Sequence, residues 1–271
     1  MIAEKKFSEL ISLLSTAESA ALAFSGGVDS SFLLKAMKLS GMRTLAVTSV
    51  SETMPKRAQI EAGATAKEIG AEHLIIKTEE LGNESFSSNP PERCFHCKDE
   101  LFGKLTKIAQ QRHYRFVFDG SNADDLNDYR PGRKAAELHG VRSPLAECGI
   151  SKDEIRVMSK KLGLGTWDKP SSPCLSSRFP YGRRITAEAL GRVERAEEFL
   201  RSLGLTEVRI RDHGDTARIE VGPDMISACA EASMRIRIVE ELRTIGYKFV
   251  SLDLEGYRSG SMNRVLDKKR G

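Results

Sequence analysis

The turn at residues 25–30 constrains this chain more than any other feature: it reads Ser25-Gly26-Gly27-Val28-Asp29-Ser30. It directly follows the apolar run 20–24 and opens a segment with helical spacing, 28–40. Neighbouring glycines let a backbone turn tightly and approach a ligand without a Cβ clash. The N–H groups of such a turn, together with a helix N-terminus, point at an anion. The turn therefore predicts a phosphate site in a nucleotide enzyme, the alternative being an ordinary glycine-rich connection between strand and helix.

Two better-known phosphate motifs are absent from this turn. No Gly-Lys-Ser/Thr follows the glycines, as a Walker loop requires, and the G-x-G-x-x-G spacing of dinucleotide-binding folds is missing. The hydroxyls of Ser25, Ser30 and Ser31 add hydrogen-bond donors. Asp29 is acidic at a place where bare phosphate is disfavoured, so we expect Mg²⁺ or water between the two.

The composition indicates a soluble protein of two domains. The chain has 271 residues, 30% of them charged, with a formal net charge of +4, and this length suffices for two domains. No apolar run approaches a membrane span and the N-terminus lacks a signal-peptide core, so we expect a cytoplasmic location and no membrane partner. Acidic residues interleave with the basic ones, which disfavours a nucleic-acid partner. Five cysteines, an odd number, argue against a disulfide framework.

The first half of the chain alternates strand and helix patterns. Strands are predicted at 20–24, 43–50, 73–77, 115–119 and near Val141, and helices at 4–16, 28–40, 55–69, 97–112 and 132–139. The alternation predicts an α/β fold with a doubly wound parallel sheet over residues 1–165. Because ligands bind beyond the carboxyl ends of such strands, we expect one pocket to hold both Ser25 and Gly120. Asp124 follows the same strand as Gly120, either as a Mg²⁺ ligand or as a helix N-cap.

The second half is organised differently. Helix 151–162 begins with Ser151 and Glu154, the spacing of a capping box. Residues 166–184 have little periodicity, and we interpret them as a functional linker that carries Cys174. Residues 185–271 predict a smaller α+β domain for substrate binding or oligomerisation, with helices at 186–203, 223–231 and 233–246 and strands at 206–212, 216–221 and 247–253.

Three cysteines lie in segments rich in polar and turn residues. Cys94 and Cys97 form a C-x-x-C at the start of a predicted helix, where thiol pKa values fall, and Cys174 lies in the linker. A lone C-x-x-C is a weak signal, compatible with a redox pair, with coincidence, or with zinc held by three cysteines and His96. The third interpretation is an iron–sulfur cluster on Cys94, Cys97 and Cys174, which leaves one iron open for a sulfide or a substrate sulfur.

Charged side chains on the predicted elements offer anion sites. Period-two alternation places Arg209 and Arg211 on one face of strand 206–212, where two guanidinium groups suit a phosphate or two carboxylates. A solvated strand face is the alternative. Lys98 follows the C-x-x-C and either neutralises charge during a reaction or is a solvated helix lysine.

Together these segments resemble the LarE family of ATP-dependent sulfur transferases, within the PP-loop ATP pyrophosphatases (adenine nucleotide alpha hydrolase-like). The likeness covers nearly the whole chain. It rests on the turn at 25–30 and on four further motifs: Arg93-Cys94-x-x-Cys97-Lys98, Gly120-Ser121-Asn122-Ala123-Asp124-Asp125, Asp128-Tyr129-Arg130-Pro131-Gly132, and Pro173-Cys174-Leu175-Ser176-Ser177-Arg178-x-Pro180-Tyr181-Gly182. The last is the most specific.

The resemblance implies a reaction in nickel-pincer nucleotide cofactor biosynthesis. ATP with Mg²⁺ adenylates a carboxylate of pyridinium-3,5-biscarboxylic acid mononucleotide, and a sulfur nucleophile then displaces AMP. Because all three cysteines are present, the resemblance favours the branch whose [4Fe-4S] cluster passes on a sulfide from an external donor. The other branch sacrifices the sulfur of the cysteine at Cys174. A homo-oligomer, dimer-based or hexameric, is also implied.

The same resemblance assigns residues to roles. ATP would contact Ser25, Gly26, Gly27, Val28, Asp29, Ser30, Gly120 and Asp124. The pyridinium substrate would contact Ser177, Arg178, Glu197, Arg209 and Arg211. Catalysis would use Cys94, Cys97, Lys98 and Cys174, with the three cysteines as cluster ligands. The competing functions are tRNA thiolation, disfavoured by the mild charge, amidation by a related PP-loop synthetase, and a zinc-stabilised nucleotide-binding module without activity.

Overall fold

The chain folds as two compact units in a computed structural model that describes residues 2–127, 131–170, 172–258 and 261. Unit 1 comprises Met1–Phe86 and Pro91–Ser172, and unit 2 comprises Ser87–Pro90 and Pro173–Gly271. The division after Ser172 falls inside the segment 166–184 that the sequence indicates as a linker. The four residues Ser87–Pro90 leave unit 1 and return to it, an excursion that the sequence does not reveal.

Unit 1 is built on a four-stranded parallel sheet of order β3-β2-β1-β4. Its strands are β1 (Ser19–Ala23), β2 (Arg43–Val50), β3 (Glu72–Lys77) and β4 (Phe116–Phe118). The strand expected near Val141 is reduced to a single parallel bridge between Phe118 and Arg142. The strand order changes direction between β1 and β4, and this switch point is where open α/β sheets bind ligands.

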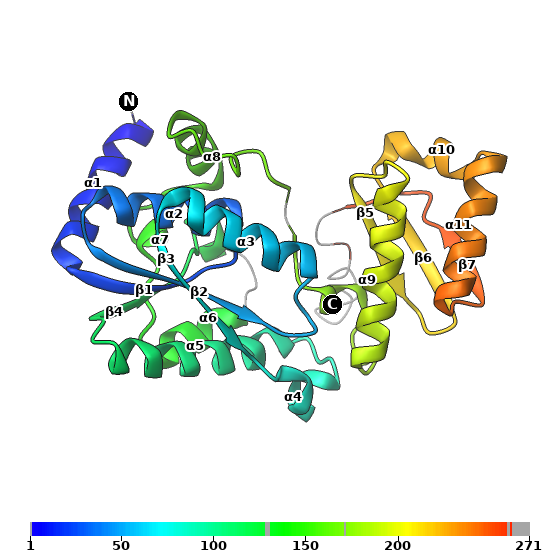
Figure 1. Cartoon of the computed structure of the whole chain (residues 1–271), viewed down its shortest axis with the longest axis horizontal. Helices are drawn as coiled ribbons and strands as arrows, with labels where there is room; N and C mark the ends of the chain where they lie inside the picture. The colour runs from blue at the N-terminus through cyan, green and yellow to red at the C-terminus, as the bar shows by residue number, and fades with distance from the viewer. Residues whose placement is uncertain (1, 128–130, 171, 259–260, 262–271) are drawn as a thin grey trace. The chain divides into compact units, whose positions relative to one another are not determined.

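Helices cover both faces of this sheet, as doubly wound architecture requires (Figure 1). One core joins α1, α2, α3, α7 and α8 to the sheet through residues such as Leu14, Phe32 and Ile155, and the other joins α5 and α6 through Phe102 and Ala135. The helices of unit 1 are α1 (Ile2–Ala17), α2 (Val28–Leu39), α3 (Lys56–Ile69), α4 (Glu84–Ser87), α5 (Arg93–Gln111), α6 (Gly132–Leu138), α7 (Pro144–Glu147) and α8 (Lys152–Lys161), with α4 ending at the first residue of the excursion. The expected α/β sheet is confirmed as a Rossmann-like arrangement.

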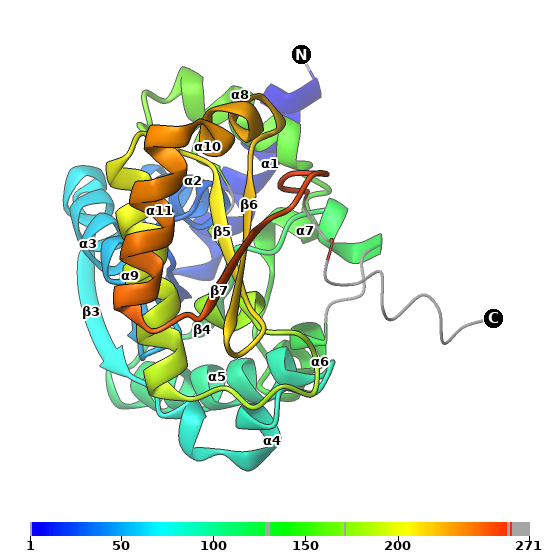
Figure 2. The same cartoon turned by 90° about the vertical axis from the view of Figure 1, so that its right-hand side faces the viewer.

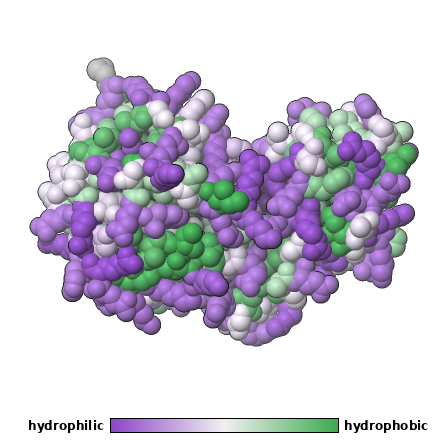
Figure 3. Space-filling model, viewed as in Figure 1, coloured by the Kyte–Doolittle hydropathy of each residue, from purple (hydrophilic) through white to green (hydrophobic). Residues whose placement is uncertain are grey.

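The outer edge of the sheet is less covered. Strand β3 has only half-buried and exposed residues, and Ile75 is 55% exposed. Figure 3 shows an apolar surface over this edge within a mostly hydrophilic face. Across the described ranges, no helix combines the length and the apolar character needed to cross a membrane.

Unit 2 contains a three-stranded mixed sheet of order β5-β6-β7. Strand β5 (Val208–Asp212) pairs antiparallel with β6 (Thr216–Val221), and β6 pairs parallel with β7 (Phe249–Leu252). Helices α9 (Ala187–Ser202), α10 (Ile226–Ala230) and α11 (Ala232–Ile245) complete the unit, and Figure 2 shows α9 and α11 against one face of the sheet.

Two helix starts bear on the functional residues. The expected capping box of α8 is confirmed, since Ser151 Oγ accepts from Glu154 N and Glu154 Oε2 accepts from Ser151 N. Helix α5 begins at Arg93 rather than at residue 97. Cys94 and Cys97 therefore lie one turn apart within its first turns, on the same face of the helix.

Candidate functional site

The turn at 25–30 folds as a closed loop between β1 and α2. The Oγ atoms of Ser25 and Ser30 lie 3.1 Å apart, and Ser30 Oγ donates to the carbonyl of Gly27 at 3.3 Å. Gly27 is the N-cap residue of α2, and no side chain caps this helix. The N-terminal N–H groups of an uncapped helix carry a partial positive charge that favours an anion. This geometry can accommodate an anion, and the turn is called here the cradle.

Glycine is required in this cradle by close backbone approach. Gly26 has φ +66°, and a Cβ built there would lie 2.7 Å from Ala62 Cα in α3. A Cβ on Gly120, after β4, would lie 3.1 Å from Ser30 N. The turn after β1 and the turn after β4 therefore touch at the carboxyl edge of the sheet, as the sequence predicts for Ser25 and Gly120.

Two lysines from distant parts of the chain border the cradle. Lys152 Nζ donates to both carboxylate oxygens of Asp29 at 2.8 and 2.7 Å, while its main-chain N donates to Asp124 Oδ2 at 2.8 Å. Lys169 Nζ donates to the carbonyl of Gly26 at 3.0 Å and pairs with Glu61 at 2.8 Å. Two ammonium groups thus border the turn, each paired with a carboxylate. The Asp124 carboxylate caps α8 rather than its own 3₁₀ turn.

The glycine at position 26 gives a first prediction. Gly26→Ala adds a Cβ that clashes with α3 and places alanine in the left-handed region, at a cost of about 1–2 kcal/mol for the backbone alone. We expect ATP affinity to fall about tenfold or more, measured by calorimetry. Gly41→Ala is the matched control, because Gly41 has φ +78° but nothing within 4 Å of the added atom. Equal loss of ATP affinity in both variants would contradict a role for the close approach.

Cys94 and Cys97 line the first turns of α5 on unit 1. Cys94 is exposed and Cys97 is half-buried, with its Sγ 4.0 Å from Oε1 of Glu80. Glu80 is 3% exposed and also accepts from Ser51 Oγ at 2.7 Å and Thr53 Oγ1 at 2.8 Å. Its Oε2 is buried with no hydrogen-bond partner among the described residues. A buried carboxylate oxygen is costly unless a hydrogen-bond donor, a water molecule or a cation satisfies it.

Cys174 lies on unit 2 in a segment whose backbone is fixed. Residues 173–185, called here the Cys174 strap, include the 3₁₀ turn Leu175–Arg178. The carbonyl of Cys174 accepts from Ser177 N at 3.0 Å, Ser177 Oγ at 2.8 Å and Arg178 Nη1 at 3.1 Å. These three hydrogen bonds fix the backbone of Cys174, while its side chain is exposed. The Cys174 thiol is therefore accessible on an ordered segment.

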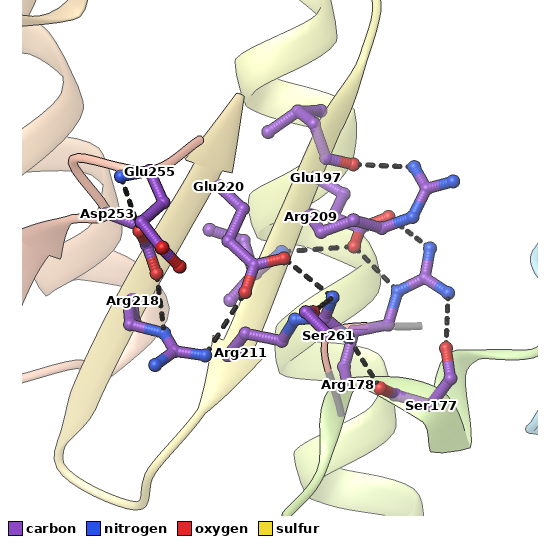
Figure 4. A network of polar contacts seen from close by, with 12 residues as sticks. Ser177, Arg178, Glu197, Arg209, Arg211, Arg218, Glu220, Asp253, Glu255 and Ser261 are labelled. Atoms are coloured by element: carbon purple, nitrogen blue, oxygen red, sulfur yellow. Dashed lines mark hydrogen bonds and ion pairs between the residues drawn. The ribbon is translucent and has the colours of Figure 1, made fainter. Parts of the chain in front are cut away.

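Arg178 and Glu197 form a fully buried ion pair behind that turn (Figure 4). Each side chain is 1% exposed, and the guanidinium donates through Nε and Nη2 to the two carboxylate oxygens at 2.8 and 3.0 Å. Glu197 also accepts from Arg201 at 2.6 Å and from Ile210 N at 3.1 Å. In the described residues, Glu197 is thus bound by Arg178, Arg201 and the backbone of β5, and a direct contact with the substrate stays a prediction.

Arg209 and Arg211 are buried on β5, not on a solvated face. Arg211 pairs with Glu220 at 2.6 Å and donates to the carbonyl of Ser177 at 2.8 Å. Arg209 stands over the Tyr257 ring at 4.9 Å. Burial, together with the neighbouring Arg178 guanidinium, lowers the pKa of Arg209. Figure 4 shows these arginines meeting beside Ser177. Because these guanidinium groups lie close enough to repel one another, binding of an anion beside them would be favourable.

The buried pair gives a second prediction. Burial alone raises the pKa of Glu197, but Arg178, Arg201 and Arg209 outweigh it and hold this pKa below its usual value near 4.5. Ionised Glu197 therefore stabilises unit 2 above that value, and the contribution disappears as pH falls through the lower folded-state pKa. Glu197→Gln should cost about 3 kcal/mol near neutral pH, because it leaves buried guanidinium groups without a counter-charge.

Denaturant unfolding of unit 2, followed at neutral pH and across the acid range, measures this effect. The difference between wild type and Glu197→Gln should shrink on acidification. Asp215→Asn is the control, since its pair with Lys248 is exposed on both sides and contributes at most about 1 kcal/mol. A difference that stays constant with pH would contradict the assignment.

Several site residues lie beyond the sequence analysis. The sequence does give one indication of the role of Lys152. A lysine at the first position of a helix is unfavourable beside the helix dipole, so a specific acidic partner is expected. Lys169 and Glu80 had no sequence signal, since their partners are distant in sequence.

The predicted catalytic residue Lys98 lies with its Nζ 5.0 Å from the centre of the Phe102 ring. Its Cγ is close to Gly132, where an added Cβ would lie 3.0 Å from it. In the motif 128–132, residues 128–130 lie outside the described residues. Within each described unit, no three His, Cys, Asp or Glu side chains gather as a metal site.

The fold and these two groups of residues define a Rossmann-like α/β protein with an anion cradle at its switch point and a second unit that holds a buried arginine cluster. No family model matches the chain. It is 45% identical over 266 residues to an uncharacterized protein of Synechocystis, covering 98% of this chain and 99% of that relative. It is 36% identical over 269 residues to the pyridinium-3,5-bisthiocarboxylic acid mononucleotide synthase of Lactiplantibacillus plantarum, covering 98% and 96%. An uncharacterized protein of Methanocaldococcus jannaschii is 34% identical over 239 residues, covering 88% and 90%. The chain belongs to the LarE family of pyridinium-3,5-bisthiocarboxylic acid mononucleotide synthases.

Proposed function

We propose that this protein is an ATP-dependent sulfur transferase that converts a carboxylate of pyridinium-3,5-biscarboxylic acid mononucleotide into a thiocarboxylate. The observation that carries the proposal is the combination, in one member of this family, of an uncapped anion cradle with an exposed cysteine on a fixed backbone. The cradle suits ATP, and the thiol suits sulfur chemistry. Neither amidation nor a binding module accounts for both.

The first half-reaction is adenylation. A substrate carboxylate oxygen attacks the α-phosphorus of ATP, the bond to the β-phosphate oxygen breaks, and pyrophosphate leaves. The turn at 25–30 and Gly120 are proposed to hold the phosphates through main-chain N–H groups, with Lys152 and Lys169 supplying positive charge. Asp29 and Asp124 provide the oxygen ligands that Mg²⁺ prefers. Mg²⁺ would neutralise the charge that develops on the leaving pyrophosphate.

The second unit is proposed to recognise the substrate. A pyridinium mononucleotide carries a phosphate and carboxylates, and both are planar or branched anions that guanidinium groups bind through paired hydrogen bonds. Arg178, Arg209 and Arg211 supply those groups beside Ser177. Glu197 fixes Arg178 in place and limits the excess of positive charge. Lys98, next to the C-x-x-C, is proposed to offset charge on the acyl phosphate.

The second half-reaction replaces oxygen by sulfur. A sulfur nucleophile attacks the carbonyl carbon of the acyl adenylate, and the bond to AMP breaks. The thiols of Cys94, Cys97 and Cys174 are the soft ligands that a [4Fe-4S] cluster requires, and Cys94 and Cys174 are exposed. These three cysteines would hold the cluster, which would supply sulfide from an external donor, so that no protein sulfur is consumed.

The function is tested by incubating the protein with the biscarboxylate, ATP and Mg²⁺ and measuring pyrophosphate and AMP. We expect both products only when the pyridinium substrate is present. Pyrophosphate release that depends on tRNA instead, or on an ammonia donor, would replace this function by thiolation of RNA or by amidation.

The sulfur source is tested by anaerobic purification. A brown protein with about four irons per chain supports the cluster. A colourless protein that loses the mass of one sulfur at Cys174 after turnover supports sacrificial transfer. Colourless protein with bound zinc and no turnover would contradict both.

A further inference from the structure

The four-residue excursion of the chain into unit 2 has no role in the function proposed so far. Ser87–Pro90 leaves unit 1 after α4 and is followed at once by the Cys94–Cys97 motif. Within unit 2 this segment contacts the Cys174 strap. The same short segment thus touches the strap of one reactive cysteine and leads directly into the helix of the other two.

Asn89 makes most of these contacts. Its side chain is fully buried, and its Nδ2 donates to the carbonyl of Pro180 at 2.7 Å and to that of Phe179 at 3.3 Å. Its main-chain carbonyl accepts from Gly182 N at 2.9 Å. The neighbouring Ser87 carbonyl accepts from Ile185 N at 2.8 Å. Four hydrogen bonds therefore join the excursion to the strap, and the side-chain amide of Asn89 donates two of them.

The backbone of Asn89 is also unusual. It has φ +60°, in the left-handed region, and it precedes Pro90 and Pro91. Asparagine adopts this conformation more readily than other non-glycine residues, and four hydrogen bonds hold the segment here. Proline fixes φ, so the link from Asn89 to Arg93 is short and stiff. Asn89 is therefore joined to the start of α5 by three residues, two of them proline.

We propose that Asn89 is a positioning residue for sulfur transfer: it clips the strap that carries Cys174 to the stiff segment that leads into Cys94 and Cys97. The inference rests on the proposed function. The strap has further anchors: Arg178 pairs with Glu197, Arg183 pairs with Asp212 at 2.8 Å, and the carbonyl of Ser177 accepts from Arg211 at 2.8 Å. These anchors tie the strap to the body of unit 2. The contacts of the excursion tie it instead to the segment of the chain that continues into the C-x-x-C.

Asn89→Gly tests the proposal, because glycine accepts φ +60° and the substitution removes only the amide. We expect sulfur transfer to fall about tenfold to a hundredfold, as small misplacements of reacting groups do, with kcat reduced and the KM for ATP unchanged. Pyrophosphate release should stay within about twofold, since the cradle belongs to unit 1. His113→Gly is the matched control: His113 is left-handed at φ +57° but lies after α5, and its replacement should change neither rate.

Hydrogen exchange supplies the readout that does not depend on activity. The Gly182 and Ile185 amides, which the excursion binds, should exchange about tenfold faster in Asn89→Gly, the effect of losing about 1.4 kcal/mol of local stability. If that variant fails to fold, Asn89→Ser keeps one donor and should show an intermediate effect. Wild-type exchange rates, or a wild-type rate of sulfur transfer, would overturn the inference. If wild type itself makes no thiocarboxylate, the proposed function fails, whatever the exchange data show.

Discussion

Cys174→Ala is expected to abolish sulfur transfer, with a loss of at least about a thousandfold, while substrate-dependent pyrophosphate release continues. The structural reason is a separation of roles along the strap. The groups that hold residue 174 bind its carbonyl, from Ser177 and Arg178, and leave the thiol exposed. Removing the sulfur therefore leaves the backbone and the buried Arg178–Glu197 pair in place, and the cradle on unit 1 is untouched.

The measurement follows thiocarboxylate by mass spectrometry and pyrophosphate by a coupled assay in the same reaction. Cys229→Ala is the matched control, because Cys229 is buried in α10 and should affect neither product. If Cys174→Ala lost pyrophosphate release to the same extent as sulfur transfer, the division of labour between the two units would be wrong. A variant that still transferred sulfur would remove Cys174 from the reaction.

Asp29→Asn is expected to act on the other half-reaction, lowering pyrophosphate release by about a hundredfold to a thousandfold. Asp29 lies in the first turn of α2 and accepts two hydrogen bonds from Lys152. The substitution removes the charge that we propose binds Mg²⁺ and leaves Lys152 without its counter-charge. Its effect on folding should be small, about 1 kcal/mol, because the pair is partly exposed.

The rate of pyrophosphate release at saturating ATP and varied Mg²⁺ measures this effect. Excess Mg²⁺ should recover part of the activity. Asp153→Asn serves as the control, since Asp153 is exposed in the first turn of α8 and next to Lys152 in the chain. Should Asp29→Asn release pyrophosphate at the wild-type rate, adenylation would not depend on this carboxylate.

Local sequence patterns were sufficient to predict the α/β architecture. Alternating apolar runs and helical spacing located all four strands of the first sheet, and the capping box at Ser151 located α8. Both patterns depend only on residues that are close in sequence, so they can be recognised without knowledge of the fold. The start of α5 was missed because Glu92 makes no side-chain cap and the preceding residues are prolines, which indicate a turn.

The tight turn at 25–30 was also predictable, because glycine at position 26 satisfies a local need for positive φ. Anion binding by this turn stays a prediction. The residues that surround the turn could not be predicted. Lys152, Lys169 and Glu80 reach the site through contacts that span many residues, and no periodicity encodes such pairings. The excursion at 87–90 is the clearest example, since four residues with turn composition change unit without any signal in the pattern.

The arginine cluster shows a different limit. Alternation on strand 206–212 correctly placed Arg209 and Arg211 on one face but could not tell a solvated face from a buried one. The ion pair of Arg211 with Glu220 across the sheet, and that of Arg178 with Glu197, decide that question. Burial of charged residues depends on partners from other elements, and these appear only in the folded structure.

The central claim is that ATP drives replacement of oxygen by sulfur on a pyridinium carboxylate, and one reaction tests it most directly. The anaerobically purified protein is incubated with the biscarboxylate mononucleotide, Mg²⁺ and a sulfide donor, with and without ATP, and the small-molecule products are weighed by mass spectrometry. The account predicts a product in which sulfur has replaced oxygen, formed only with ATP and accompanied by equal amounts of AMP and pyrophosphate. A substrate that leaves the reaction with its mass unchanged while ATP is cleaved to AMP, or one that gains sulfur without ATP, would contradict it.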